Sequence, residues 1–578
     1  MNYTWNYKAP TQEQIDAAEA LANETRVSPV LCRMLVNRGI DTAEAVRKFF
    51  RPQLHDLHDP FLMNGMDRAV ERLNQAMGNR ERIMIYGDYD VDGCTAVALV
   101  YRFLQQFYSN IEYYIPDRYD EGYGVSIQGI DHAVSKGVKL IIVLDCGIKA
   151  VDEIQYAKDH GIDFIICDHH VPDPLLPPAV AILNAKMPGN TYPCLDLSGC
   201  GVGFKFMQAF AISNGIAFSN LIPLLDLVAV SIASDIVPIM GENRILAYHG
   251  LRQLNNNPSV GLKAIVDVCG LKERDLTMAD IVFKIGPRIN ASGRMQNGSE
   301  SVDLLIEHNS ERAHEKAEQI NRYNEERKEL DKRMTEDASN YVEEHPEMQA
   351  RSSIVMYNED WHKGVIGIVA SRLTEIYFRP AVVLTRTDDM VTGSARSVSC
   401  FDVYKAIQSC SDLLDNFGGH TYAAGLSLKV ENVSAFTARF QDYVDAHIEP
   451  EQTQAILDID EVLSFSDITP RFCADVKRMR PFGPDNPKPI FCSRQVFDYG
   501  TSKVVGREQE HIKLELVDNT SNRVMNGIAF GQSAKARFIN TKQAFDIVYT
   551  LEENTRRHGE IQLKIEDIKP SSQNYGKE

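Results

Sequence analysis

The sequence predicts an α/β protein with a doubly wound parallel sheet, a second and smaller α/β domain joined to it by a long helix, and a C-terminal β-barrel. Three observations support this fold class. Between residues 66 and 308, short apolar runs alternate with amphipathic segments, which is typical of a parallel sheet with helices on both faces. Residues 309–345 are dense in charge, which predicts a long exposed helix. Beyond Pro450 the strands become short and closely spaced, which indicates a small barrel.

The domain organisation follows from these patterns and from the length of 578 residues, which is too great for one hydrophobic core. A helix that begins near Gly364 and a strand at Ala381–Leu384 indicate the second α/β domain. We expect an N-terminal helical extension (1–65), an α/β catalytic domain (66–308), the connecting helix (309–345), the second α/β domain (346–449), the barrel (450–570) and a disordered tail (571–578).

Composition and charge narrow the class of protein. The net charge of -19 is the reverse of the bulk basicity of most nucleic-acid binders, so local arginines or metal ions would have to meet any polyanion. Eleven cysteines without a CxxC pair, and a polar segment after Met1, predict a reducing, cytoplasmic location. The longest apolar stretch, Leu221–Ala233, contains Pro223 and Asp226, so we expect no membrane-spanning segment.

Acidic residues follow the predicted strands of the first sheet. Those strands are Ile83–Tyr86, Glu112–Ile115, Leu140–Leu144, Phe164–Cys167 and Val180–Leu183. Ligands of doubly wound sheets bind beyond the carboxyl ends of the strands. Asp88, Asp145 and Asp168 each lie within a few residues of such an end, so one crevice is expected to collect them.

The segment Asp88-x-Asp90-x-Asp92 would place its carboxylates on one side if it were extended. It also resembles the start of an EF-hand calcium loop, but the bidentate glutamate of such a loop would fall at Leu99. An enzyme site is therefore the better interpretation. Asp235 also lies behind an apolar run. Carboxylates with one or two imidazoles suit Mn²⁺ or Mg²⁺ better than zinc.

Each of these residues also has a plainer interpretation. A single aspartate is most often a helix cap or a turn residue, and adjacent histidines such as His169 and His170 can simply cap a loop. Their repetition behind successive apolar runs favours a metal site. Cys94, Cys146 and Cys167 lie beside the acids, and we expect them to pack as small apolar groups.

These motifs resemble those of the DHH phosphoesterase superfamily, which are Asp88-x-Asp90-x-Asp92-Gly93, Asp145, Asp168-His169-His170 and Asp235. Within that superfamily, other segments are similar to motifs of the RecJ family of bacterial single-strand-specific exonucleases. They are residues 116–124, 286–294, 361–367, 418–425 and 481–487, so the resemblance covers nearly the whole chain. One departure is Tyr86, which stands where many superfamily members have histidine.

The resemblance implies a role for each candidate site residue. Asp145 would bridge two divalent ions, with Asp92, His169 and Asp235 completing one ion and Asp90 and Asp88 holding the other. The implied catalytic residues are Asp145, His169, His170, which would face the phosphate, and His420, which would also contact the substrate. Arg118, Ser394 and Arg396 would hold a 5′ terminal phosphate, and Arg288, Asn290 and Arg294 would line a strand-wide channel.

The function implied by the resemblance is hydrolysis of single-stranded DNA from 5′ to 3′ with two Mn²⁺ or Mg²⁺ ions, in recombination and repair. Single-strand-binding protein and a helicase are the implied partners. The barrel resembles an OB-fold, whose DNA-contacting candidates here are Lys503, Arg507, His511 and Lys513. Tyr123 is a candidate for stacking on a base.

Two alternatives stay open at this point. Sibling phosphoesterases hydrolyse pyrophosphate, cyclic dinucleotides, short oligonucleotides or adenosine bisphosphate, although their chains generally lack this combination of motifs. A repair or replication scaffold with the same fold but without metals is the non-enzymatic alternative, and such a chain would be expected to lose the ligands that this one retains. The sequence does not determine processivity, the preferred ion, activity on RNA or the oligomeric state.

Overall fold

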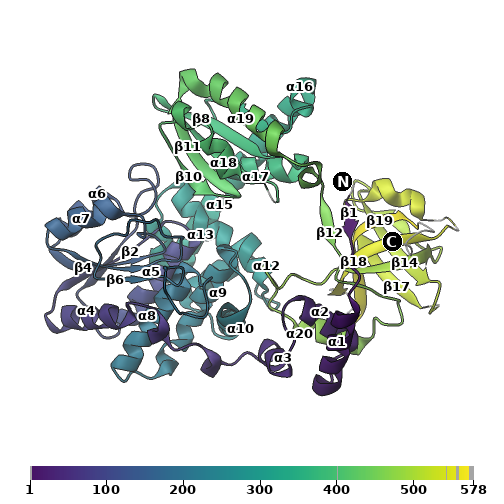
Figure 1. Ribbon diagram of the computed structural model, residues 1–578, viewed down its shortest axis with the longest axis horizontal. Coiled ribbons are helices and arrows are strands. Elements are labelled where there is room, and N and C mark those ends of the chain that lie inside the picture. Colours follow the sequence, from purple (N-terminus) through teal and green to yellow (C-terminus); the bar gives the residue numbers. More distant parts are fainter. Residues whose placement is uncertain are drawn as a thin grey trace. The chain divides into compact units, whose positions relative to one another are not determined.

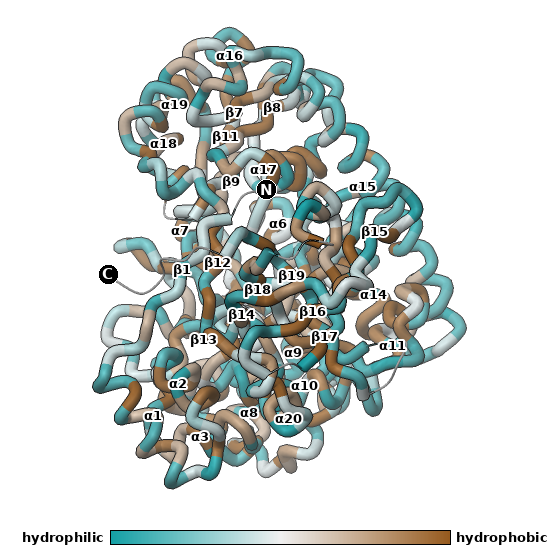
Figure 2. The backbone as a smooth tube through the Cα atoms, turned by 90° about the vertical axis from the view of Figure 1, so that its right-hand side faces the viewer, coloured by the Kyte–Doolittle hydropathy of each residue, from teal (hydrophilic) through white to brown (hydrophobic). Residues whose placement is uncertain are grey.

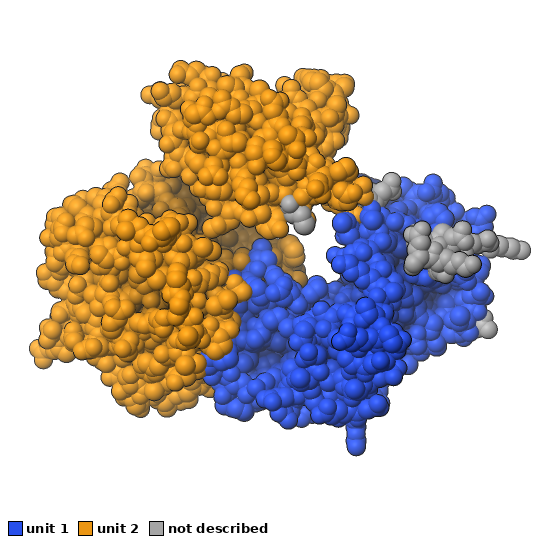
Figure 3. All heavy atoms as spheres, in the orientation of Figure 1, with its two compact units in different colours: residues 1–58, 236–249, 456–578 blue, residues 59–235, 250–455 orange. Residues whose placement is uncertain are grey.

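The computed structural model describes residues 3–399, 401–521, 523–539, 541, 543–554 and 559–571. The chain divides into two compact units (Figure 3). Unit 1 is built from three separate segments, residues 1–58, 236–249 and 456–578, and unit 2 from residues 59–235 and 250–455. Each unit is described by itself below. Residues 572–578 of the predicted tail lie outside the described residues.

Unit 2 begins with a five-stranded sheet in which all neighbours are parallel, in the order β3-β2-β4-β5-β6. The strands are β2 (Arg82–Gly87), β3 (Ile111–Tyr114), β4 (Val138–Leu144), β5 (Asp163–Cys167) and β6 (Ala181–Leu183). All five predicted strands are confirmed within two residues at either end. The chain order reverses between β2 and β4, and doubly wound folds bind their ligands at the carboxyl ends of the two strands that flank such a reversal.

Helices cover both faces of this sheet, as predicted (Figure 1). Alternate strand residues such as Tyr86 and Val143 pack with Ile130 and Ile154 from helices on one face. The opposite face is covered by the apolar helices that follow β2 and β6. The helices of this domain are α4 (Met66–Gly78), α5 (Val91–Leu104), α6 (Ile127–Ser135), α7 (Val151–Asp159) and α8 (Gly199–Ser213).

A helical region follows the first sheet. It comprises α9 (Leu225–Ser234), α10 (Gly241–Asn256), α11 (Val260–Val268), α12 (Met278–Asp280), a π-helical turn (Ile281–Ile285), α13 (Gly286–Met295), α14 (Ser299–Leu305) and α15 (Ser310–Glu344). The predicted connecting helix is confirmed as α15, whose 35 residues extend over about 50 Å. Figure 2 shows that α15 is hydrophilic over most of its length.

The second domain of unit 2 is a mixed sheet in the order β10-β11-β9-β8-β7. Its strands are β7 (Ile354–Tyr357), β8 (Ala381–Thr387), β9 (Met390–Arg396), β10 (Asn416–His420) and β11 (Ala423–Lys429), and only β7 and β8 are parallel to each other. Its helices are α16 (Pro346–Gln349), α17 (Ile366–Tyr377), α18 (Val403–Gln408) and α19 (Val433–His447). Residues of α15 and α17 pack on one face, and residues of α18 and α19 on the other.

Unit 1 contains a closed five-stranded barrel in the order β14-β18-β19-β17-β16, in which β16 pairs back to β14. The barrel strands are β14 (Phe491–Asp498), β16 (His511–Asp518), β17 (Val524–Ala529), β18 (Phe545–Glu553) and β19 (Ile561–Pro570), flanked by β13 (Glu461–Val462) and β15 (Lys503–Val505). Helices α1 (Gln12–Thr25), α2 (Pro29–Asn37), α3 (Ala43–Phe50) and α20 (Pro470–Arg478) share its core. Strand β1 (Thr4–Asn6) pairs with β12 (Ile456–Asp458).

The remaining elements are short 3₁₀ turns at Leu54–Asp56, Pro60–Leu62, Phe218–Asn220, Ile222–Leu224, Ser411–Leu413, Val430–Asn432, Pro450–Thr453 and Ser533–Phe538. None of the helices within the described residues combines the length and the apolar character that crossing a bilayer demands.

Candidate metal centre

The three aspartates after β2 span a strand end and a helix start, so the extended segment on which the one-sided placement was conditional is not present. Asp88 follows the strand, Asp90 is the N-cap of α5, and Asp92 lies in the first turn of that helix. The Asp90 side chain accepts a hydrogen bond of 3.0 Å from the amide of Gly93, because a helix start leaves its first N–H groups without partners. The tight turn into the helix, rather than strand alternation, brings the three carboxylates together.

Asp92 is fixed by the N-terminus of α8, a contact that the sequence did not indicate. Its carboxylate accepts hydrogen bonds from the amides of Gly199 (2.6 Å) and Cys200 (2.8 Å) and from the hydroxyl of Ser231 (2.6 Å). A Cβ at Gly199 would lie 2.6 Å from the Cβ of Asp145, so only glycine fits there. Glycines at 199, 201 and 203, directly after Ser198, were the signal that could have identified this helix start.

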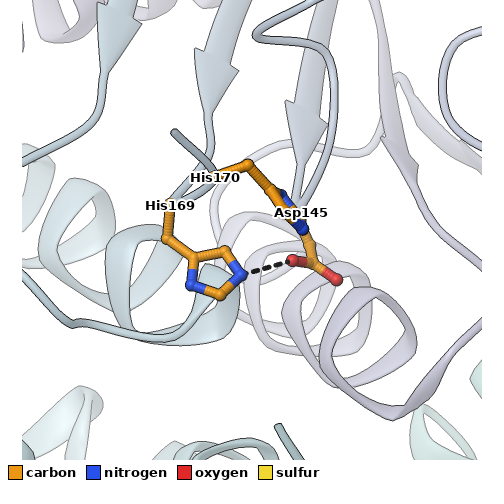
Figure 4. A group of neighbouring side chains, drawn as sticks. All are labelled: Asp145, His169 and His170. Atoms are coloured by element: carbon orange, nitrogen blue, oxygen red, sulfur yellow. Dashed lines mark ion pairs between the residues drawn. The ribbon is translucent and has the colours of Figure 1, made fainter. Parts of the chain in front are cut away.

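His169 lies at the middle of the acidic residues. Its Nε2 is 3.2 Å from Asp145 Oδ1 (Figure 4). The same atom is 3.6 Å from Asp235 Oδ2 and 3.9 Å from Asp92 Oδ2. Asp145 comes from the end of β4 as predicted, with a left-handed φ of 60°. Asp235, which we grouped with residues at strand ends, instead follows helix α9. The apolar run before it is helical because it packs against α5 and α8 rather than in the sheet.

Asp168 orients His170, a role that the sequence analysis did not assign. Its carboxylate accepts hydrogen bonds from the amides of Ile148 (3.0 Å), His169 (2.7 Å) and His170 (3.1 Å). The Nδ1 of His170 lies 2.7 Å from Asp168 Oδ1. Burial opposes ionisation of Asp168, but its contacts with His170 lower its pKa to about 2. Burial likewise opposes protonation of His170, but the Asp168 carboxylate raises the pKa of this imidazole.

Two further side chains face His170. The Tyr123 hydroxyl is 3.4 Å from Nε2 of His170, and the ring of His420 stacks on the His170 ring with centroids 6.2 Å apart. Burial and the neighbouring His170 lower the pKa of His420. His420 is the last residue of β10, so the second domain of unit 2 supplies a side chain to the centre.

The electrostatics of the centre require cations from outside the chain. Burial and neighbouring carboxylates raise the pKa of Asp88, Asp90 and Asp145, and raise that of Asp235 to about 9. No lysine or arginine of the described residues forms an ion pair with the acidic ligands. Asp88 Oδ1 and His169 Nδ1 are buried without a hydrogen-bond partner.

The donor set fits hard divalent ions. Ligand atoms of Asp145, His169 and His170 lie within 4.8 Å of one another, and so do those of Asp92, His169 and Asp235. These are oxygen and nitrogen donors, which Mn²⁺ and Mg²⁺ accept. Cys94, Cys146 and Cys167 are buried, as predicted, and burial raises the pKa of each thiol, so they do not supply thiolate ligands.

Tyr86 takes a structural role at the position where many superfamily members have histidine. Its hydroxyl donates to the carbonyl of Gly124 (3.0 Å) and accepts from the amide of Ser126 (3.2 Å). Its ring stacks on Tyr114 with centroids 5.4 Å apart. Tyr86 therefore holds the loop that carries Arg118 and Tyr123, and its hydroxyl is occupied by Gly124 and Ser126.

A cluster of arginines adjoins the acidic centre. Burial and the guanidinium groups of Arg118, Arg396 and Arg327 lower the pKa of Arg294 to about 9. Burial and Arg118 also lower the pKa of Arg396. The guanidinium of Arg118 lies 5.0 Å from the ring centroid of Tyr89, the residue between Asp88 and Asp90. We call Arg118, Arg294, Arg327 and Arg396 the arginine cluster; the sequence analysis missed Arg327, which lies on α15.

The contacts of this cluster inside the protein are to neutral groups. Arg294 Nη1 donates to the carbonyl of Gly364 (2.9 Å), and Arg396 Nη1 donates to Ser394 Oγ (2.9 Å). Arg288 borders the cluster beside Arg327, whose pKa it helps to lower, and its own guanidinium donates to Asn321 of α15 (2.9 Å) and to the carbonyl of Lys284 (2.8 Å). Asn290 lies half-buried on α13.

The barrel candidates lie on β15, β16 and the turn between them. Lys503 pairs with Lys513 across the two strands, and Val505 pairs with His511. The ring of His511 meets the exposed ring of Phe530 edge-on at 5.1 Å. Its Nε2 also lies 3.3 Å from Glu510, so the surface here carries both signs of charge.

Comparison with known proteins places each domain. Residues 82–232 match the family described as DHH family, N-terminal domain, residues 351–446 match the DHHA1 domain, and residues 459–567 match the RecJ OB domain. Among solved structures, RecJ from Thermus thermophilus in complex with Mn²⁺ has a TM-score of 0.83 at 24% identity, covering 99% of this chain and 80% of that one. Another exonuclease RecJ bound to manganese has a TM-score of 0.59 at 29% identity, covering 68% and 97%.

Full-length relatives are more similar in sequence. The single-stranded-DNA-specific exonuclease RecJ of Bacillus subtilis is 36% identical over 89% of this chain, which spans 64% of that relative's length. The RecJ exonucleases of Haemophilus influenzae and Escherichia coli are each 31% identical, over 95% and 97% of this chain and 98% of either relative. The acidic centre, the three domain matches and these relatives agree: the chain belongs to the RecJ family of DHH phosphoesterases.

Proposed function

We propose that this protein is a metal-dependent exonuclease that removes nucleotides from the 5′ end of single-stranded DNA. The observation that carries the proposal is the pairing of two unneutralised clusters in unit 2. One is a largely buried set of carboxylates suited to divalent cations, and the other is a half-buried set of guanidinium groups suited to an anion. Arg118 links them through its contact with Tyr89. A terminal phosphate and an adjacent phosphodiester supply the anionic groups that both clusters lack.

We assign the acidic ligands as the family resemblance implies. Asp145 would contribute to both metal sites, Asp92, His169 and Asp235 would complete one, and Asp88 and Asp90 would form the other. Mn²⁺ or Mg²⁺ bound there would supply an activated water and would neutralise the leaving oxygen. The chain itself contributes the placement: the α8 amides fix Asp92, and Asp168 fixes His170. His170, with its raised pKa, then presents a ring N–H toward the phosphate.

The arginine cluster sets the polarity of the reaction in this proposal. Arg118, Ser394 and Arg396 bind the 5′ terminal phosphate, since guanidinium forks and a hydroxyl are good phosphate donors. Arg294 adds positive charge behind them, and His420 contacts the substrate beside His170. With the 5′ phosphate anchored, the next phosphodiester along the strand meets the acidic centre.

The remaining parts of the proposal concern the cellular role. The barrel of unit 1 grips single strands further along, as OB-folds do through stacking and local positive charge. The protein acts in the cytoplasm in DNA recombination and repair. Single-strand-binding protein and a helicase are its expected partners, because they expose and present the single strand.

One digestion experiment tests the proposal. Single- and double-stranded DNA labelled at either end are incubated with Mn²⁺, Mg²⁺ or a chelator, together with a 5′-phosphorylated dinucleotide. We expect loss of the 5′ label from the long single strand first, metal dependence, and little cleavage of duplex. Release from the 3′ end, or faster turnover of the dinucleotide than of the long strand, would favour a sibling phosphoesterase. Lack of any metal-dependent cleavage would favour the scaffold alternative.

A further inference from the structure

Phe283 is an aromatic residue with no structural role in unit 2. Its side chain is 75% exposed, more than any other large apolar side chain of the described residues. It lies in the π-helical turn Ile281–Ile285 that leads directly into α13. Such turns interrupt regular helices and occur frequently at functional sites. An exposed aromatic ring on this turn therefore calls for an external partner.

Helix α13 lies against both segments that carry the acidic ligands. A Cβ at Gly286 would be 2.7 Å from Ser234 Oγ, next to Asp235. A Cβ at Gly293 would be 2.8 Å from the carbonyl of Tyr89, between Asp88 and Asp90. Because only glycine allows such approaches, the helix axis passes directly along the acidic centre.

Phe283 lies just before the first turn of this helix. Gly286, Asn290 and Gly293 are spaced by four and three residues, so they lie on one side of α13. That side begins next to Arg294 of the arginine cluster and passes the metal ligands. The π-helical turn with Phe283 follows at its other end, about 15 Å from Gly293 along the axis. A strand anchored at its 5′ phosphate and cleaved at the acidic centre would continue toward Phe283.

We propose that Phe283 stacks on a base of the single-stranded substrate, within a few nucleotides on the 3′ side of the scissile phosphate. This inference rests on the proposed function. The ring offers a flat apolar face that is exposed to water in the free protein. A base that stacks on it removes this apolar surface from water, which is favourable. Every base has such a face, so the contact holds any sequence. It also requires an unpaired strand, because bases in a duplex are already stacked on one another.

The test compares Phe283→Ala with Phe283→Trp and with Phe107→Ala. Phe107 is also an exposed phenylalanine of unit 2, with 43% of its side chain exposed. It follows the C-terminal end of α5, so it lies about 20 Å from the ligands at the start of that helix. On long 5′-phosphorylated strands we expect Phe283→Ala to raise KM about tenfold with little change in kcat. Phe283→Trp and Phe107→Ala should keep the KM of the unmodified protein. A 5′-phosphorylated dinucleotide should be turned over equally by all of them.

An abasic scan identifies the stacked base. Strands with one abasic position at a time should show a single internal position that raises KM in the unmodified protein. That position should have no further effect in Phe283→Ala, since the contact is already absent. The inference is overturned if Phe283→Ala leaves KM unchanged, or if its effect is the same at every abasic position.

Failure of the inference is distinguishable from failure of the proposed function. Strand binding is measured by fluorescence anisotropy in an Asp145→Asn background, which does not depend on turnover. If the unmodified protein degrades single strands and Phe283→Ala binds them equally well, only the inference fails. If the unmodified protein neither cleaves nor binds single-stranded DNA, both fail.

Discussion

The acidic centre and the arginine cluster of unit 2 each gather side chains of a single sign of charge, negative in the first and positive in the second. The chain leaves both without an ion-pair partner that would neutralise them. In the first, burial raises the pKa of Asp88, Asp90, Asp145 and Asp235. In the second, burial lowers the pKa of Arg294, Arg327 and Arg396. Arg72, in the same unit, shows the ordinary alternative. It pairs with Glu81 (2.7 Å) and Asp163 (2.6 Å), so its charge is neutralised within the fold.

The difference between Arg72 and the two clusters indicates that each cluster serves to bind a ligand of opposite charge. Like charges held together in the interior cost stability unless a ligand neutralises them. Where the two clusters adjoin, Arg118 opposes the rise in the pKa of Asp88, but its guanidinium stacks on Tyr89 and forms no ion pair with Asp88, so the neutralisation is only partial. Each therefore stays available for a ligand of opposite charge, divalent cations for one and phosphate for the other.

Among the variants that test this comparison, removal of the Asp145 carboxylate should have the largest effect on activity. We expect Asp145→Asn to lower kcat on the order of a thousandfold or more, because the substitution removes a charged ligand from the centre. The melting temperature of the metal-free protein should not fall, since one of several repelling charges is gone. Asp163→Asn, which alters a neutralised carboxylate paired with Arg72, should retain activity. Manganese-dependent turnover by Asp145→Asn would contradict the assignment.

Metal binding should stabilise the protein, and the effect should depend on pH. Asp235 has a folded pKa of about 9 against about 3.9 for an unfolded aspartate. Between those values the folded state binds more protons, so the metal-free protein should lose stability as pH rises through this window. Free Mn²⁺ at a hundred times its Kd should restore about 2.7 kcal/mol for each site.

Thermal unfolding with and without chelator, from pH 6 to 9, measures both effects. The Asp145→Asn variant should show a smaller Mn²⁺ stabilisation and a flatter pH dependence. A metal-free protein whose stability rises with pH would contradict the raised pKa values.

Weakening the arginine cluster should reduce the preference of the protein for strands that carry a 5′ phosphate. We expect Arg396→Ala to lower kcat/KM about thirtyfold on strands with a 5′ phosphate, the loss of about 2 kcal/mol that one charge-assisted hydrogen-bonded group provides. On 5′-hydroxyl strands the same variant should differ little from the unmodified protein. Arg439→Ala, which alters an exposed arginine paired with Asp412, is the matched control. Equal losses on both kinds of end would remove the arginine cluster from terminal-phosphate binding.

The smallest expected effect separates a loop anchor from a metal ligand. Tyr86→Phe leaves the buried carbonyl of Gly124 and amide of Ser126 without the hydroxyl, which should cost about 1 kcal/mol of folding stability. Mn²⁺ affinity, measured by titration, should change less than twofold. Tyr156→Phe, which removes a hydroxyl bonded to Asp131 at the surface, should change neither. A large loss of Mn²⁺ affinity in Tyr86→Phe would return this residue to the metal centre.

Several features of the site followed from sequence pattern. Asp88, Asp145 and Asp168 were placed at one edge of the sheet because parallel strands carry their carboxyl ends to the same side. The clustering of Asp235 and His169 was anticipated, although Asp235 follows a helix and not a strand. The apolar run before Asp235 has the same pattern that a buried strand or a buried helix would have, so periodicity could not distinguish the two.

Other features depended on contacts between distant segments. The amides of Gly199 and Cys200 that hold Asp92 come from more than a hundred residues away. Arg327 joined the arginine cluster because α15 passes beside α13, and a charge-rich helix gives no sign of which arginine faces inward. The N-terminal helices packed on the C-terminal barrel, where sequence distance offers no guide.

Sequence pattern was enough to predict the strands of the first sheet, the long helix, the two α/β domains and the barrel, and the residue types that a hard-metal site needs. These are local properties, encoded in periodicity and in the residues that follow each apolar run. Folding in three dimensions was needed to show which carboxylates converge on His169, which arginines remain without an acidic partner, and which ring stays exposed beside α13. Those outcomes depend on how distant segments pack, and burial and electrostatic interaction between groups are defined only once the chain has folded.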